Sequence, residues 1–244
     1  VPPKNDDFVG ADHPTADYLL DDPLGASVDG MKDSSGNDYT GTHQNGVVLR
    51  RRPALKCEDW KNPLHHPDSW CDPFNYKNQG YSAFYDGTAD HSYANNVPQA
   101  GSWDENGHHI TESFSADAWG FPIGDGHGHA HGTLGLMSHG QEFEVYYDGR
   151  WHARLVNGTE LVGPAQDSDQ WYHVGVTWDG NYVRLYVNGQ LVDSRSGVTN
   201  AWSGHGNKDT LFVGRTNISA SAWWHGSHAR WASYGIRTSR IFWA

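Results

Sequence analysis

The stretch from Gln170 to Val192, QWYHVGVTWDGNYVRLYVNGQLV, constrains the fold more than any other part of the chain. Apolar and polar residues alternate on both sides of Asp179-Gly180, and Asn188-Gly189 follows as a second turn signal. Alternation of this kind predicts two strands that each bury one face, and Asp-Gly and Asn-Gly favour tight hairpin turns. The stretch therefore predicts an antiparallel hairpin.

Similar short segments with glycine-rich turns recur along the chain, and no amphipathic helix of useful length interrupts them. Further strands are predicted at residues 18–20, 41–49, 82–85, 113–121, 133–138, 142–147, 151–156, 211–214 and 231–236. Many short strands at regular spacing are typical of a two-sheet sandwich. Since no linker or internal repeat is present, we expect residues 1–244 to form one all-β domain, a jelly-roll sandwich of two curved antiparallel sheets.

The charge balance excludes one large class of partner. The formal net charge is -12, with 17 basic residues against 29 acidic ones. Nucleic-acid binding needs a basic surface that neutralises phosphates, so no nucleic acid is expected. No apolar run reaches the length of a membrane span, so no membrane insertion is expected. No organic cofactor is expected either.

Two cysteines, Cys57 and Cys71, lie close together in a loop-like segment rich in proline, aspartate and tryptophan. We interpret them as a disulfide that closes this loop. Two free thiols are the alternative, and a zinc pair is disfavoured because the spacing is too wide for a zinc knuckle. A disulfide indicates an oxidising compartment, so we expect a secreted, extracellular protein.

Several segments, taken in order, resemble the laminin-G-like branch of the concanavalin A-like lectin/glucanase superfamily. They are DSSGN at 33–37 with YTG at 39–41, FYDGT at 84–88, FSADAWGFP at 114–122, the hairpin at 170–192 and LFVG at 211–214. The resemblance covers most of residues 17–236. It implies a jelly roll with a concave face that often meets carbohydrate.

The resemblance also bears on calcium. The family usually closes with a strand that carries an acidic pair, and here Ala232 and Ser233 stand in its place. A structural calcium ion would therefore draw on Asp33, Asn37 and backbone carbonyls, since a hard cation takes oxygen ligands.

A second metal hypothesis concerns the glycine-rich loop at 124–132. His127, His129 and His131 alternate in this loop, and neutral imidazoles are ligands for zinc, copper or nickel. A polar loop that holds no metal, and that contacts a ligand directly, is the alternative.

The strand faces carry side chains that fit elimination chemistry. His152 and Arg154 alternate on one predicted strand, and His173 and Tyr186 lie on the hairpin. If all four line one concave groove, Arg154 neutralises a uronate carboxylate, and a histidine or tyrosine removes the adjacent proton while tyrosine protonates the leaving oxygen. Polysaccharide lyases on similar jelly rolls support this by analogy. The alternative is a convex, solvated face.

The sequence therefore predicts a secreted carbohydrate-active protein, with a polysaccharide lyase acting on an anionic, uronate-containing glycan as the favoured activity. A non-catalytic lectin-like or adhesion module is the alternative. Glycoside hydrolysis is less favoured, because Glu142 and Glu144 lack the fuller E-x-D-x-E pattern. The residues expected to contact substrate are His139, Tyr146, Arg184, Trp223 and Trp224.

Overall fold

The computed structural model describes residues 16–18, 20, 30–33, 35–45, 47–51, 82–85, 90–97, 113–122, 133–140, 142–168, 170–199, 209–216, 235–236 and 239–242. Every regular element within these ranges is a β-strand, which confirms the all-β class. Within the same ranges no helix is long and apolar enough to span a membrane.

One large sheet has six strands that pair antiparallel. Their order is β1 (Ala16–Tyr18), β16 (Ser239–Phe242), β6 (Phe114–Gly120), β11 (Tyr172–Trp178), β12 (Val183–Val187) and β13 (Gln190–Arg195). The predicted hairpin forms β11 and β12, and Val176 lies opposite Leu185 as the alternation requires.

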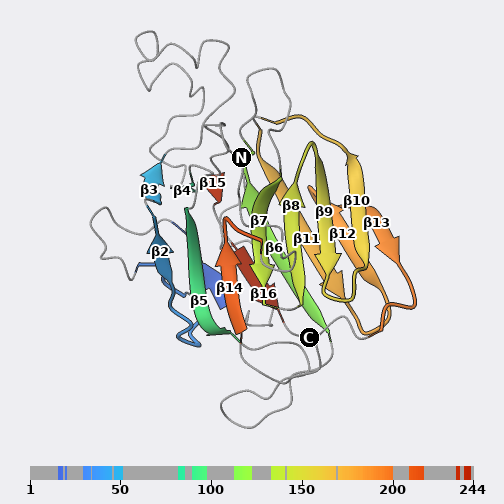
Figure 1. Cartoon of the computed structure of the whole chain (residues 1–244), viewed down its shortest axis with the longest axis horizontal. Helices are drawn as coiled ribbons and strands as arrows, with labels where there is room; N and C mark the ends of the chain where they lie inside the picture. The colour runs from blue at the N-terminus through green and yellow to red at the C-terminus, as the bar shows by residue number, and fades with distance from the viewer. Residues whose placement is uncertain are drawn as a thin grey trace.

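The other large sheet has seven antiparallel strands. Their order is β10 (Glu160–Ala165), β9 (Arg150–Leu155), β8 (Phe143–Tyr147), β7 (Leu134–His139), β14 (Asp209–Val213), β5 (His91–Val97) and β2 (Thr42–Gln44). A third sheet joins β15 (Gly235–Ile236), β4 (Ser82–Phe84) and β3 (Val48–Arg51). Figure 1 shows the two large sheets stacked, with the small sheet at one end.

Aromatic contacts join the two large sheets across the core. Phe114 of β6 stacks on Phe143 of β8 with ring centroids 4.9 Å apart. Trp151 of β9 meets Tyr172 of β11 edge to face at 5.7 Å. Large buried rings of this kind dominate the energy of a core, so these contacts fix the sandwich. The predicted jelly-roll sandwich is confirmed.

Because side chains alternate across a strand, each sheet also has an outer face. We call the outer face of the seven-stranded sheet the front face; it carries Thr42, Gln44, His91, Tyr93, Asn95, Ser138, Glu144, Tyr146, His152, Arg154, Glu160, Val162, Thr210 and Phe212. We call the outer face of the six-stranded sheet the back face; it carries Ser115, Asp117, Trp119, His173, Gly175, Thr177, Arg184 and Tyr186.

The predicted strands differ from the observed ones at specific places. The single strand predicted at 41–49 is two strands, β2 and β3, and four strands were not predicted: β5, β10, β13 and β16. In β5 the buried positions are Ser92, Ala94 and Val97, and the exposed pair Asn95-Asn96 interrupts the alternation before Val97. Small buried residues give no apolar alternation, and asparagine is depleted in strands, so the pattern contains no strand signal.

Candidate functional site

A polar cluster occupies the front face where β8, β9 and β10 lie side by side. We call it the Tyr146 cluster; its members are Glu144, Tyr146, His152, Arg154 and Glu160. The β8–β9 register places Tyr146 opposite His152 and Glu144 opposite Arg154. The Tyr146 and His152 rings stack with centroids 4.5 Å apart. Neighbouring strands thus bring together three of the residues that the sequence singled out.

Arg154 is the centre of this cluster's hydrogen bonds. Its Nη1 donates to Glu144 Oε1 at 3.2 Å. Its Nη2 donates to the Tyr146 hydroxyl and to Glu160 Oε1, both at 3.1 Å. Tyr146 in turn donates its hydroxyl hydrogen to Glu160. The Arg154 guanidinium is therefore already paired with two carboxylates, those of Glu144 and Glu160. Glu144 is only 1% exposed.

The cluster's protonation follows from these contacts. Burial raises the pKa of the Tyr146 hydroxyl, and its hydrogen bond to Glu160 raises it further. Burial also raises the pKa of Glu160, but hydrogen bonds from Tyr146 and Arg154 outweigh this and leave it below its ordinary value. Tyr146 is therefore a neutral phenol and Glu160 a carboxylate at neutral pH. A neutral phenol can donate a proton, but it is not a ready base.

The electrostatics do not favour a uronate carboxylate at this place. Asp148 adds a third carboxylate, 2.9 Å from His152 Nε2. A substrate carboxylate would have to displace Glu144 or Glu160 from Arg154, and a carboxylate left without its cation in a half-buried place is costly. Arg154, which was predicted to neutralise the substrate carboxylate, instead pairs with Glu144 and Glu160.

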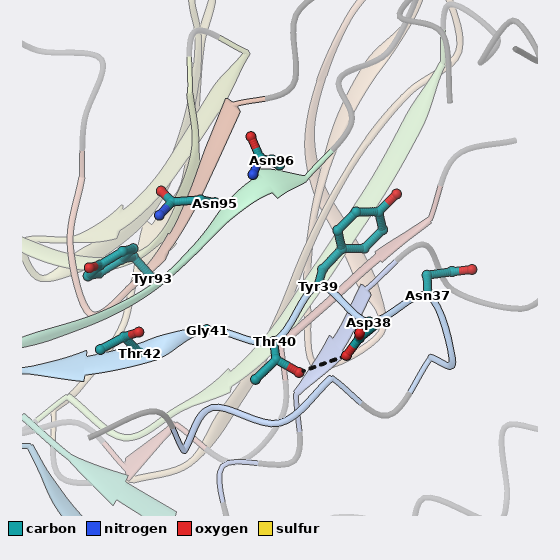
Figure 2. Close-up of a pocket in the computed structure, with 9 residues that line it drawn as sticks. All are labelled: Asn37, Asp38, Tyr39, Thr40, Gly41, Thr42, Tyr93, Asn95 and Asn96. Carbon is teal, nitrogen blue, oxygen red and sulfur yellow. Dashed lines mark hydrogen bonds between the residues drawn. The ribbon is translucent and has the colours of Figure 1, made fainter. Parts of the chain in front are cut away.

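A pocket of about 430 Å³ lies toward the other edge of the front face. It is lined by Asn37, Asp38, Tyr39, Thr40, Gly41, Thr42, Tyr93, Asn95 and Asn96. Figure 2 shows the side chains of β5 along one side of this pocket and residues 37–42 along the other. Four strand spacings separate β5 from β9, which places the pocket roughly 19 Å from the Tyr146 cluster.

Asp33 holds the loop that forms one wall of the pocket. Its Oδ1 accepts hydrogen bonds from the Asp17 and Ser35 amides at 3.0 and 2.9 Å. Its Oδ2 accepts from the Ser35 hydroxyl at 2.8 Å and from the Tyr39 amide at 3.0 Å. These donors occupy the acceptor sites of the carboxylate. Asp33 therefore does not fit a calcium ligand here, although calcium binding itself stays a prediction.

Backbone geometry also shapes the pocket. A Cβ on Gly41 would lie 2.3 Å from the Tyr93 carbonyl oxygen and 2.4 Å from Met31 Cε, so only glycine permits this approach of the loop to β5. Asp38 and Asn96 have φ angles of 60° and 61°, in the left-handed region. Aspartate and asparagine tolerate that region better than other non-glycine residues. The local sequence therefore fits the shape of the pocket.

Aromatic side chains extend the front face beyond the pocket. The Tyr93 ring, which lines the pocket, lies 6.3 Å from the Phe212 ring, and His91 lies 5.9 Å from Phe212. The Arg215 guanidinium lies over the Phe212 ring, 5.0 Å from its centre. Planar rings beside a polar pocket can stack on the apolar face of a sugar.

Residues 214–216 cross β7 between the pocket and the Tyr146 cluster. The Ser138 hydroxyl donates to the Arg215 carbonyl oxygen at 3.0 Å. A Cβ on Gly135 would lie 2.6 Å from the Thr216 nitrogen, which shows how closely this segment packs on the sheet. The front face is thus divided into two separate polar regions.

The back face holds the remaining predicted catalytic residues. His173 Nε2 lies 3.1 Å from Asp117 Oδ1, and Tyr186 sits one strand away on the same side. His152 and Arg154 lie on the front face, with the aromatic core in between. The expectation that all four line one groove is wrong, because alternation fixes faces within a strand but does not assign strands to sheets.

The predicted substrate contacts divide in the same way. Tyr146 lies on the front face, whereas Arg184 lies on the back face, where it pairs with Asp179 at 2.7 Å. His139 is fully buried: its Nδ1 pairs with Glu142, and its Nε2 lies 3.2 Å from the Val97 carbonyl oxygen. The expected contact of His139 with substrate is wrong, because the ring is fully buried and cannot reach a ligand on the surface.

Other predicted residues lie outside the described ranges. They are Cys57, Cys71, His127, His129, His131, Trp223 and Trp224. The disulfide, the histidine metal site and the tryptophan contacts therefore stay predictions. Among the residues that the structure does describe, no three His, Cys, Asp or Glu side chains are grouped as a metal site.

The pocket residues on β5 were not predicted from the sequence. The available signals were the turn chemistry of residues 33–41 and the adjacent pair Asn95-Asn96. Adjacent asparagines point to a turn or bulge. Without β5 as a strand, nothing in the pattern placed them opposite the turn.

Two antiparallel sheets packed face to face, with a polar pocket on one outer face, define a lectin-like β-sandwich. A family model described as the concanavalin A-like lectin/glucanases superfamily, of laminin-G type, matches residues 86–234. The chain belongs to this family, as the sequence resemblance indicated. No curated protein matches the sequence.

Solved structures share the fold at low identity. Domain 4 of AbnA, an extracellular arabinanase from Geobacillus stearothermophilus in complex with arabinotriose, is 16% identical, with a TM-score of 0.55 and coverage of 96% of this chain and 93% of that one. The botulinum neurotoxin serotype D binding domain is 14% identical, with a TM-score of 0.53 and coverage of 94% and 47%. Trypanosoma rangeli sialidase in complex with sialic acid is 13% identical, with a TM-score of 0.54 and coverage of 93% and 30%.

This chain therefore spans about half the length of the botulinum binding domain and less than a third of the sialidase. At these identities the likeness shows a shared fold.

Proposed function

We propose that this chain is a carbohydrate-binding protein, and that one sugar unit of its glycan occupies the pocket between β2, β5 and residues 37–42. The observation that carries the proposal is the pocket's lining of amides, hydroxyls, two tyrosine rings and one carboxylate. Its volume of about 430 Å³ lies within the range of roughly 300–1,000 Å³ that small-molecule sites occupy.

The chemistry of the lining matches a polyol. Each sugar hydroxyl both donates and accepts, and asparagine amides and threonine hydroxyls offer both functions. The rings of Tyr93 and Phe212 supply adjoining apolar surface for the C–H face of the same or the next sugar. An extended glycan would thus run from the pocket across β14.

The comparisons support a carbohydrate-related function in general terms. Domain 4 of AbnA is described with arabinotriose and the sialidase with sialic acid. An extracellular location agrees with such a ligand and is part of the proposal.

Binding is favoured over elimination as the function. A lyase would need a cation that is able to take the uronate carboxylate, and Arg154 is already paired with Glu144 and Glu160. The predicted partners His173 and Tyr186 lie on the back face. Cleavage of a uronate glycan stays a prediction that the same experiment can test.

The experiment compares two single variants with the unmodified chain on a panel of immobilised plant and bacterial polysaccharides. Asn95→Ala removes an exposed amide from the pocket, and His173→Ala is the matched control on the back face. We expect Asn95→Ala to weaken binding roughly three- to tenfold, the worth of one or two hydrogen bonds, and His173→Ala to leave binding unchanged.

Ultraviolet absorbance of an unsaturated sugar product is followed in the same samples. Absence of binding to every polysaccharide would refute the proposal. Undiminished binding by Asn95→Ala would refute the pocket as the site, and a rise in absorbance that His173→Ala abolishes would establish the lyase in its place.

A further inference from the structure

We infer that the pocket accepts uncharged sugars and discriminates against uronates, sialic acids and other anionic units. This inference rests on the proposed function and names the class of glycan that the same pocket takes. It concerns the charge of the lining, which is separate from the question of whether the pocket binds sugar at all.

The nine lining residues carry one carboxylate, Asp38, and no cation. Asp38 is exposed, and its hydrogen-bond partner is the Thr40 hydroxyl, with Oγ1 3.4 Å from Asp38 Oδ1 (Figure 2). Among the described residues no lysine or arginine forms an ion pair with it. The pocket therefore presents an uncompensated negative charge to its occupant.

Hydrogen bonds to Asp33 fix the backbone of the loop that carries this carboxylate. Asp33 anchors the loop on both sides of Asp38, through the amides of Ser35 and Tyr39. Asp38 itself adopts the left-handed conformation at φ 60°. The backbone that carries Asp38 is therefore held at the pocket wall, so its charge stays beside the pocket when a ligand binds.

Arg215, a described cation on this part of the front face, is outside the lining. Arg215 rests on the Phe212 ring, and Phe212 in turn contacts Tyr93, so one aromatic residue separates the guanidinium from the pocket wall. An anionic sugar seated in the pocket would face Asp38 without a partner. Two like charges about 5 Å apart near a protein surface repel enough to lower affinity roughly fivefold or more.

The test uses ligand pairs that differ in charge but keep the linkage. They are sodium polygalacturonate with its fully methyl-esterified form, and alginate with its carboxyl-reduced form, beside neutral arabinan. Affinity is measured for the unmodified chain and for Asp38→Asn, which keeps the size of the side chain and its tolerance of the left-handed conformation. Arg215→Gln is the control for a charge contact outside the pocket.

We expect the neutral member of a pair to bind at least fivefold more tightly than the charged member. We expect Asp38→Asn to reduce this difference in affinity, which we call the gap. Added salt should narrow it too, because exposed charges are screened. If the charged member binds equally or better, or if Asp38→Asn leaves the gap unchanged, the inference is overturned while carbohydrate binding stands. If no member of any pair and no arabinan binds, the proposed function fails first.

Discussion

The buried pair of His139 and Glu142 allows a stability prediction that can be worked out from the contacts. Both side chains are 0% exposed and pair with each other at the turn from β7 to β8. The other ring nitrogen of His139 faces the Val97 carbonyl oxygen at 3.2 Å, so both ring nitrogens face acceptors. The pair thereby ties the start of β8 to the ends of β7 and β5.

Replacing Glu142 with alanine should remove part of the chain's stability. The substitution leaves the buried His139 Nδ1 without its partner, and leaving one side of a buried hydrogen bond unsatisfied costs about 1–3 kcal/mol, more where a charged group is involved. Domains of this kind are stable by roughly 5–15 kcal/mol in total. Glu142→Gln keeps an acceptor oxygen and should cost less. The double variant His139→Phe with Glu142→Leu should recover part of the loss, because the two buried polar side chains are removed together, while the Val97 carbonyl oxygen still loses its contact with His139.

Urea denaturation followed by tryptophan fluorescence measures these free energies of unfolding. The matched control is Arg195→Ala, which removes an exposed partner of Asp193 and should change stability by less than about 1 kcal/mol. If Glu142→Ala unfolds within about 1 kcal/mol of the unmodified chain with an unchanged urea slope, the pair does not contribute as argued. The single variants His139→Phe and Glu142→Leu are measured as well. If the double variant loses as much free energy of unfolding as these two single variants together, the account of the unpaired donor is contradicted.

Three further outcomes are expected from other parts of the fold. Gly41→Ala should lower the melting temperature, because the added Cβ clashes with β5 at a cost of at least about 2 kcal/mol. Gly175→Ala is the control and should not lower it, because its Cβ would have no contact closer than 3.7 Å. Arg154→Met should lower the urea midpoint by removing the cation from Glu144, which is 1% exposed, and adding Glu144→Gln should restore most of the loss. Burial raises the pKa of Tyr172 to about 12, so its folded form holds the proton more tightly than the unfolded form. Stability from this group is therefore complete below the ordinary tyrosine pKa of about 10 and is lost as pH rises from there to about 12, and alkaline unfolding of Tyr172→Phe should show a smaller loss.

The local sequence pattern was sufficient to predict the β11–β12 hairpin, but it was insufficient to predict which strands join which sheet. The alternation in residues 170–192 predicted β11 and β12, because buried and exposed positions are determined within each strand. It also placed His152 and Arg154 together, and Tyr146 joins them because β8 and β9 are consecutive strands. Whether a given hairpin belongs to the front or the back sheet depends on pairings between distant segments. The alternation of residues along a strand does not report pairings between distant segments. For this reason His173 was wrongly expected to share a groove with His152 and Arg154.

The pocket was missed for a different physical reason. On β5, which forms one wall of the pocket, the buried positions are Ser92, Ala94 and Val97, and because two of them are small and Asn95-Asn96 interrupts the alternation, the strand leaves no clear hydrophobic pattern. Its other wall was recognised only as a family-like turn. The role of Asp33 in holding that turn follows from four hydrogen bonds, which a sequence motif cannot distinguish from metal ligation, since both need a carboxylate at a turn.

Family membership and binding specificity rest on different parts of this chain. The family model matches residues 86–234 and includes the hairpin that marks the superfamily, but that hairpin contributes no residue to the pocket. Six of the nine lining residues, 37–42, precede the matched region, and Asp38 is one of them. The shared sandwich therefore supplies the sheet, while residues that precede the matched region carry Asp38, to which we attribute the preference for uncharged sugars. It follows that ligands of other superfamily members are a poor guide to the ligand of this one, and that variants at Asp38, Thr40 or Thr42 should change glycan preference without changing the fold.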